Sequence, residues 1–212
     1  MKTPFTCGRL LWCLVAMLLL SGCQGTGATV NFDPHALSAP PNRAGSVHSD
    51  DLIILVEPFQ DARPQPHRLG SRTHLWGGVT NFNAWNGNIS EGMTDLAIDY
   101  LKQRNWQTSR ATADQKGEAP SADVTLTGTV LSLNANAKSG VGFTEIVVDM
   151  KVRFEAKKTI DGRTVRMVLG ANGSDTVAFF DPKDVDRLIN LVAKDLYNQL
   201  FQDLAVKNRA SH

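Results

Sequence analysis

The clearest pattern of apolar and polar positions lies in the second half of the chain. From 146 to 156, apolar residues recur at every second position. A period of two is typical of a strand with one packed face and one solvated face. The same alternation predicts strands over 124–130 and 164–171, and Asp161 followed by Gly162 predicts a hairpin turn. We therefore expect neighbouring antiparallel strands packed on one side.

Shorter patterns predict the other elements. The apolar run 52–56 predicts a buried strand, and 106–109 predicts a short one. Apolar residues three and four positions apart predict amphipathic helices that begin at Ser90 and after Asp181. The segment 60–88 is rich in Gly and Asn and is expected to be a long loop. The order β-α-β-β-β-β-α predicts an α+β fold: a mainly antiparallel sheet of four to five strands with two helices on one face.

The first 22 residues have the pattern of a targeting signal. Lys2 and Arg9 accompany an unbroken apolar run from 10 to 20. As a helix those eleven residues rise about 16 Å, short of the roughly 30 Å hydrocarbon core of a bilayer. A permanent transmembrane helix is therefore the weaker interpretation, and we expect residues 1–22 to be a signal peptide that is removed.

The signal ends in Leu20-Ser21-Gly22-Cys23, which resembles the bacterial lipobox. The resemblance implies transfer of diacylglycerol to the Cys23 thiol, cleavage after Gly22, and acylation of the new amino group with a fatty acid such as palmitate. Gln24 at the second mature position, where aspartate would imply retention in the inner membrane, implies an outer-membrane anchor on the periplasmic face. An ordinary signal peptide with a chance cysteine is the alternative.

The net charge and the cysteine content argue against some classes of protein function. The 212 residues carry 22 Lys and Arg against 21 Asp and Glu, a net charge of +1, and removal of the signal makes it −1. This balance argues against a protein that binds nucleic acid through a basic surface. Cys7 and Cys13 leave with the signal and acylation consumes Cys23, so we expect no disulfide, cysteine nucleophile or cysteine-based metal site in the mature protein.

After the signal, residues 23–50 are expected to be a flexible tether, since they are rich in Gly, Ser, Ala, Pro and Asn and have no apolar period. The periplasmic domain is expected over 51–206. The lipobox, the segments 59–64 and 122–128, the alternating strands and the C-terminal helix together resemble YajG-type lipoproteins of Gram-negative bacteria. They resemble more loosely the LptE-type α+β lipoproteins of outer-membrane assembly and export machines. The resemblance implies a non-enzymatic protein without a cofactor.

Catalytic and metal-binding patterns are weak. His67 and His74 lie in the same predicted loop as Asp61, but their spacing matches no helical or strand face, so surface histidines are the plainer interpretation. Serines next to glycines lack the nucleophile-elbow pattern. The glycines around Val141 indicate a hairpin tip rather than a phosphate loop. We predict no enzyme and no metal site.

The predicted loop carries the candidate binding residues. Three large rings, Trp76, Phe82 and Trp85, lie among glycines and asparagines. They either pack into the core or meet a partner, which would be a protein through hot-spot contacts or a glycan or lipid surface through stacking. Three arginines lie near the loop: Arg63, Arg68 and Arg72. Their positive charges would suit an anionic partner such as lipid headgroups, although a solvated surface is the alternative.

Two functions remain in competition. The leading hypothesis is a lipid-anchored outer-membrane lipoprotein that acts by binding, as an accessory subunit of an envelope assembly or export complex. Its expected partners are the membrane, through acylated Cys23, and an envelope protein or a second copy of the chain. The alternative is a peptidoglycan- or glycan-binding module that uses Trp76 and Trp85.

Overall fold

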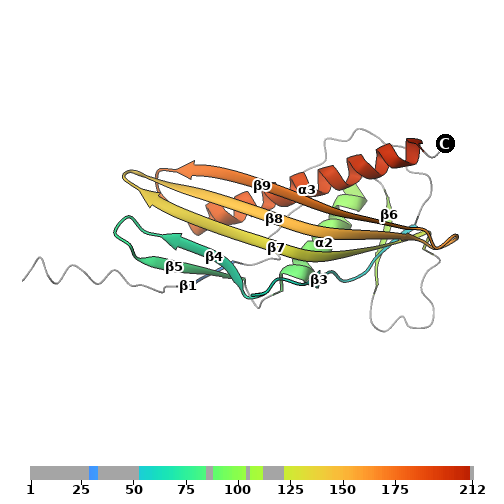
Figure 1. The fold of residues 1–212 in the computed structure, drawn as a ribbon, viewed down its shortest axis with the longest axis horizontal. Coiled ribbons are helices and arrows are strands. Elements are labelled where there is room, and N and C mark those ends of the chain that lie inside the picture. The colour runs from blue at the N-terminus through green and yellow to red at the C-terminus, as the bar shows by residue number, and fades with distance from the viewer. Residues whose placement is uncertain (1–28, 33–52, 85–87, 104–105, 112–121, 211–212) are drawn as a thin grey trace, which may run out of the picture.

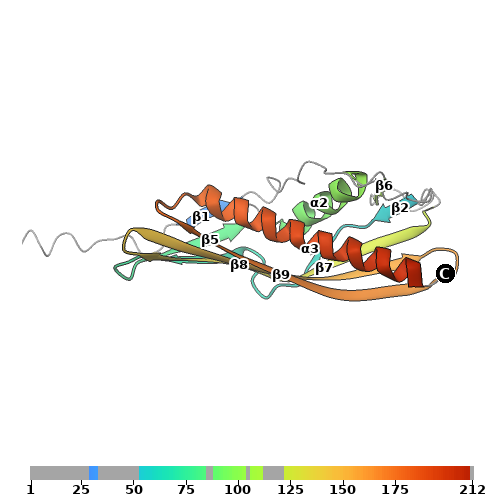
Figure 2. The same cartoon turned by 90° about the horizontal axis from the view of Figure 1, so that it is seen from above.

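The computed structural model describes residues 29–32, 53–84, 88–103, 106–111 and 122–210, with side chains up to residue 200. Its described strands form one sheet, and both of its helices lie on the same face of that sheet (Figures 1 and 2). In chain order the elements are β1 (Thr29–Phe32), β2 (Ile53–Val56), β3 (Gln60–Asp61), β4 (Arg68–Thr73), β5 (Val79–Ala84), α2 (Ile89–Gln103), β6 (Gln107–Arg110), β7 (Val124–Gly140), β8 (Phe143–Lys158), β9 (Thr164–Val177) and α3 (Pro182–Ala210).

Strand β7 organises the sheet because it is much longer than its partners on one edge. Along the other edge it pairs with β8 over nearly its whole length, and β8 pairs in turn with β9, both antiparallel. On the edge with shorter partners, β2, β3 and β4 follow one another, all parallel to β7. β6 lies beyond β2, and β5 and then β1 lie beyond β4.

The α+β class is confirmed, but the predicted sheet of four to five mainly antiparallel strands is wrong. The sheet is nine-stranded and mixed. Part of the reason is that β2 and β6 pair in parallel, although β3, β4, β5 and α2 lie between them along the chain. The other part is the segment 60–88, which was expected to be a loop and instead contributes β3, β4 and β5.

The apolar faces of β7 and β8 form the centre of the core. Alternate residues of β8 from Ile146 to Phe154 are buried, as their spacing predicts. In β7, Val130 and Leu133 both face the core because the register shifts between Val130 and Ser132. This bulge resets the phase of alternation, so the inward positions continue to Ala137. It also explains why a strict period of two ends near residue 130.

The helices contact each other as well as the sheet. The rings of Tyr100 in α2 and Tyr197 in α3 are stacked with centroids 5.3 Å apart. The Tyr197 hydroxyl donates to the Met93 carbonyl at 2.6 Å, and burial raises the pKa of this phenol. Asp181 caps α3 as predicted, since its carboxylate accepts from the Lys183 amide at 2.9 Å. Neither described helix has an apolar stretch long enough to cross a membrane.

The N-terminal strand lies inside the segment that was expected to be a tether. Thr29–Phe32 pair in parallel with residues 81–84 of β5, so this part of the chain belongs to the sheet. The predicted signal and the rest of the predicted tether, Cys23 included, lie outside the described residues.

Candidate functional site

Three chain connections lie at one end of the sheet. β4 and β7 run parallel, so the turn after Thr73 and the turn after Gly140 open at the same end. β9 runs antiparallel to β8 and returns to that end, where Val177 pairs with Thr144. In Figure 1 this is the left end of the molecule, where α3 also begins.

This end carries a concentration of exposed apolar side chains, called here the end surface. Trp76 is 81% exposed, Val141 82% and Phe179 92%. Six of the eleven large exposed apolar residues in the described part of the chain belong to it. Isolated exposed apolar residues are ordinary, but a cluster of them marks a contact site. The end surface consists of Leu75, Trp76, Val79, Val141, Phe143 and Phe179.

The β4–β5 turn presents its residues through its backbone geometry. The Gly77 amide donates to the His74 carbonyl at 3.0 Å, and the His74 amide donates to the Gly78 carbonyl at 2.7 Å. Gly77 has a φ of +90°, a conformation that glycine adopts without strain. Leu75 and Trp76 therefore occupy the two central turn positions, where side chains point away from the sheet.

The β7–β8 turn is shorter. Gly140 pairs with Phe143, which leaves Val141 and Gly142 as the turn, and Gly142 has a φ of +79°. A Cβ atom on Gly140 would lie 2.5 Å from the Phe143 ring, so only glycine lets this ring lie across the strand. The turn thereby exposes Val141 at its tip and holds Phe143 beside it.

Arg72 connects the three parts of the end surface. Its guanidinium carbon lies 4.2 Å from the centroid of the Phe180 ring, in the connection between β9 and α3. Its Nε donates to the Ser139 hydroxyl of β7 at 2.9 Å. Phe180 in turn stacks on Phe82 of β5, with the planes 5° apart. Partial burial lowers the pKa of Arg72. These contacts fix the turns relative to one another.

The aromatic candidates separate into different environments. Trp76 is exposed at the turn, as a partner-binding residue would be, whereas Phe82 is 0% exposed and belongs to the core. Trp85 lies outside the described residues. The glycan-binding alternative required Trp76 and Trp85 together, and the described structure places one of these two rings.

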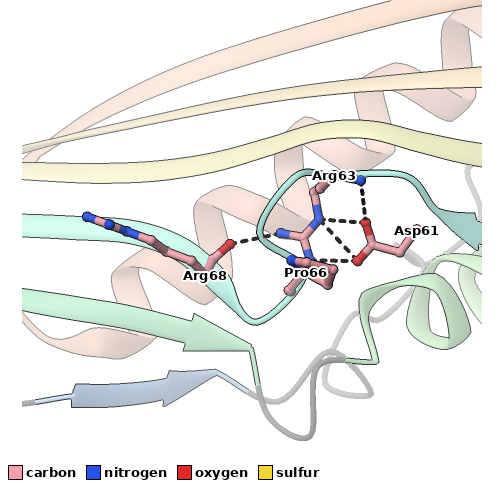
Figure 3. Close-up of polar contacts among 4 residues, drawn as sticks. All are labelled: Asp61, Arg63, Pro66 and Arg68. Carbon is pink, nitrogen blue, oxygen red and sulfur yellow. Dashed lines mark hydrogen bonds and ion pairs between the residues drawn. The ribbon is translucent and has the colours of Figure 1, made fainter.

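Of the three candidate arginines, Arg63 forms hydrogen bonds and an ion pair within the domain (Figure 3). It is buried, and its Nε and Nη2 donate to the Asp61 carboxylate at distances down to 2.7 Å. Its Nη1 donates to the Arg68 carbonyl at 3.0 Å, and Nη2 also donates to the Pro66 carbonyl. Every nitrogen of the guanidinium thus has an acceptor within the bend between β3 and β4. Arg63 therefore holds this bend and is not presented to an anionic partner.

The remaining candidate cations and metal ligands do not come together in one site. Arg68 is exposed, and Arg72 is partly buried by the contacts described above. The His74 ring bonds to the Thr80 hydroxyl at 2.8 Å, while His67 is exposed and Asp61 pairs with Arg63. Within the described ranges, no group of three or more His, Cys, Asp or Glu side chains is placed to hold a metal ion.

Sequence reasoning missed most of the end surface. Val141 and Phe179 lie far from Trp76 along the chain, and the pairing of β4 with β7 and of β9 with β8 brings the three connections together. The one available signal was local: a glycine pair follows Trp76, and glycines flank Val141. Both patterns are typical of hairpin turns, whose central residues are exposed.

Comparisons with known proteins concern the fold. No protein-family model matches the chain, and no curated protein matches its sequence. Protein XCC0632 from Xanthomonas campestris, of the DUF330 family, has a similar structure, with a TM-score of 0.53 and 9% identity over 86% of this chain and 98% of that chain. That likeness shows a shared fold.

Bacterial lipoproteins are also among the structures similar to this chain. Lipoprotein GNA1162 from Neisseria meningitidis has a TM-score of 0.39 and 13% identity over 69% of this chain and 99% of that chain. A minor lipoprotein from Acinetobacter baumannii has a TM-score of 0.40 and 14% identity over 73% of this chain and 94% of its own.

Proposed function

We propose that this protein is a lipid-anchored lipoprotein of a Gram-negative envelope that acts by binding, as an accessory subunit of an outer-membrane assembly or export complex. The observation that carries the proposal is the short distance along the chain between Cys23 of the lipobox and the strand β1, which begins at Thr29. Six residues of fully extended chain reach roughly 20 Å. An acyl anchor on Cys23 would therefore hold the folded domain close to the membrane.

Action by binding is supported by the kind of surface that the domain presents. Its most unusual surface is the end surface, an apolar cluster on fixed turns. The buried ion pair of Arg63 with Asp61 serves the bend between β3 and β4. An exposed apolar cluster is typical of a contact site.

A protein partner is supported by the free edge of β9. Among the described strands, β9 pairs with β8 alone, and it is 14 residues long. A long edge strand leaves backbone amides and carbonyls that a strand from another chain could pair with. Addition of a strand at this edge would let an anchored subunit hold a neighbouring envelope protein, or a second copy of itself, beside the membrane.

Replacement of Cys23 by serine is expected to abolish labelling of the protein with radioactive palmitate and to remove the mature form from the membrane fraction. The reason is that the thiol is the site of diacylglycerol transfer in the lipobox interpretation. Cys13→Ser is the matched control, because Cys13 lies in the apolar run of the signal and leaves with it. Labelling of the Cys23 variant at the level of the control would contradict the lipoprotein proposal.

The accessory role is tested with the anchored wild-type chain in native membranes. Chemical cross-linking followed by mass spectrometry is expected to recover one envelope protein reproducibly, with cross-links that include β9. Recovery of copies of this chain alone would contradict an accessory role and favour a homo-oligomer.

A further inference from the structure

We infer that the end surface contacts the lipid bilayer that holds the Cys23 anchor, so that the domain stands end-on with Trp76, Val141 and Phe179 in the membrane interface. The inference deepens the proposed function and rests on it, because the acylated cysteine brings the bilayer within reach. It assigns the bilayer as the ligand of the apolar cluster.

The path of the chain into the sheet places the anchor at this end. β1 runs parallel to β5, and Thr29 pairs with Asn81, two residues after β5 begins at Val79. The chain therefore enters the sheet next to the β4–β5 turn that carries Trp76. Six residues from Cys23 to Thr29 reach roughly 20 Å at most. The anchor is thus confined to the neighbourhood of the end surface.

The opposite end of the sheet lies far from that anchor. β7 has 17 residues, and at about 3.3 Å per residue it extends roughly 55 Å. The β8–β9 turn, residues 159–163, lies at its far end, where Lys158 pairs with Val124. A Cys23 anchor that reaches roughly 20 Å from Thr29 therefore cannot let the domain stand upright on this far turn.

The composition of the two ends matches this orientation. The segments 74–79, 140–143 and 178–181 contain apolar residues, glycines, one histidine and a single acidic residue, Asp181, whose carboxylate caps α3. The turn 159–163 at the other end contains Asp161 and Arg163, with Ile160 as its single large apolar residue. Charged groups are costly to bring into lipid, whereas Trp favours the interface between headgroups and acyl chains.

The form of the end surface favours a bilayer over a protein as its occupant. Its apolar residues project from three separate connections that Arg72 and Phe180 hold together. Each connection presents one or two side chains at its tip, among them Trp76 and Phe179. A fluid lipid interface accommodates such separate projections without a complementary shape, and it lies within reach of the anchor.

The experiment uses the acylated full-length mature protein in vesicles of phosphatidylethanolamine and phosphatidylglycerol. Part of the lipid carries bromine on its acyl chains, which quenches the fluorescence of tryptophan that enters the bilayer. Wild type is compared with Trp76→Phe, which keeps an apolar ring but removes the reporter. A third protein combines Trp76→Phe with Ile160→Trp, because Ile160 is 83% exposed and lies at the opposite end. Intact mass of each protein reports the acyl anchor.

We expect brominated lipid to quench wild-type emission strongly, Trp76→Phe to lose most of that quenching, and Ile160→Trp not to restore it. Acylated wild type that is not quenched would overturn the inference and favour a protein on the end surface. Quenching that persists in Trp76→Phe, or that Ile160→Trp restores, would overturn it as well. A mature protein without acyl chains would instead overturn the proposed function, and the inference with it.

Discussion

Replacement of Val152 by aspartate is expected to lower the free energy of unfolding by several kcal/mol, because it buries a charge without a partner. Val152 is 0% exposed in the middle of β8. It pairs with Val130 of β7 on one side and with Leu169 of β9 on the other. The carboxylate would therefore face the apolar core from the most central strand of the antiparallel part of the sheet.

The matched control is Lys151→Ala, one residue earlier on the same strand. Lys151 is exposed on the opposite face of the sheet, so its truncation is expected to change stability by less than about 0.5 kcal/mol. Urea denaturation of both variants, followed by circular dichroism, measures the difference. Equal unfolding midpoints for the two variants would show that the faces of β8 are assigned incorrectly.

Replacement of Phe82 by alanine is expected to cost about 3–5 kcal/mol of stability, the usual range for a fully buried aromatic residue. Phe82 is 0% exposed in β5, and its ring supports Phe180, which in turn supports Arg72. Loss of the ring would leave a cavity under the connection between β9 and α3. We therefore expect the end surface to loosen as the domain loses stability.

Trp76→Ala is the control for this second variant, since both residues belong to the same hairpin. Trp76 is 81% exposed, and its truncation is expected to change stability by less than about 0.5 kcal/mol. Comparison of the melting temperatures of the two variants shows which of the two rings contributes to the stability of the core. A large loss of stability in Trp76→Ala would mean that this ring packs against the domain and is not free to contact a membrane.

The sequence predicted the elements whose signal is local. Alternation along β8 identifies its buried face, and Asp181 identifies the start of α3. The Asp161-Gly162 turn is also present, and Gly162 has a φ of +65°. In each case a period, a cap or a turn residue acts within a few neighbouring positions, so the pattern is visible without knowledge of the fold.

The elements that were missed depend on pairing between distant segments. β4 has the sequence Arg-Leu-Gly-Ser-Arg-Thr, which has little strand signal, yet it pairs with both β5 and β7. Gly70 lies against the Ala135 carbonyl so closely that a Cβ atom would be 2.0 Å away. The contact requires glycine there, but nothing in the local sequence identifies its partner. Parallel register of this kind comes from tertiary structure.

The sequence predicted only part of the candidate site, because the rest of it also depends on contacts between distant segments. Trp76 and Phe82 have similar neighbours in the sequence, but Trp76 lies in the β4–β5 turn, whereas Phe82 lies in β5 on the buried face of that strand. Arg63 is a candidate cation until its pairing with Asp61 is known. An expected loop has no period, so the direction of its side chains cannot be derived from spacing.

The most direct test of the end-on orientation is energy transfer from a dye on the domain to an acceptor lipid in the vesicle. Val141→Cys and Ile160→Cys place a single dye at the two opposite turns of the β7–β9 sheet, and the proposed acylation of Cys23 and removal of the signal would leave no competing thiol in the mature chain. We expect efficient transfer from position 141 and weak transfer from position 160, because the strands between them extend roughly 50 Å. Equal transfer from both positions, or stronger transfer from position 160, would contradict contact between the end surface and the bilayer.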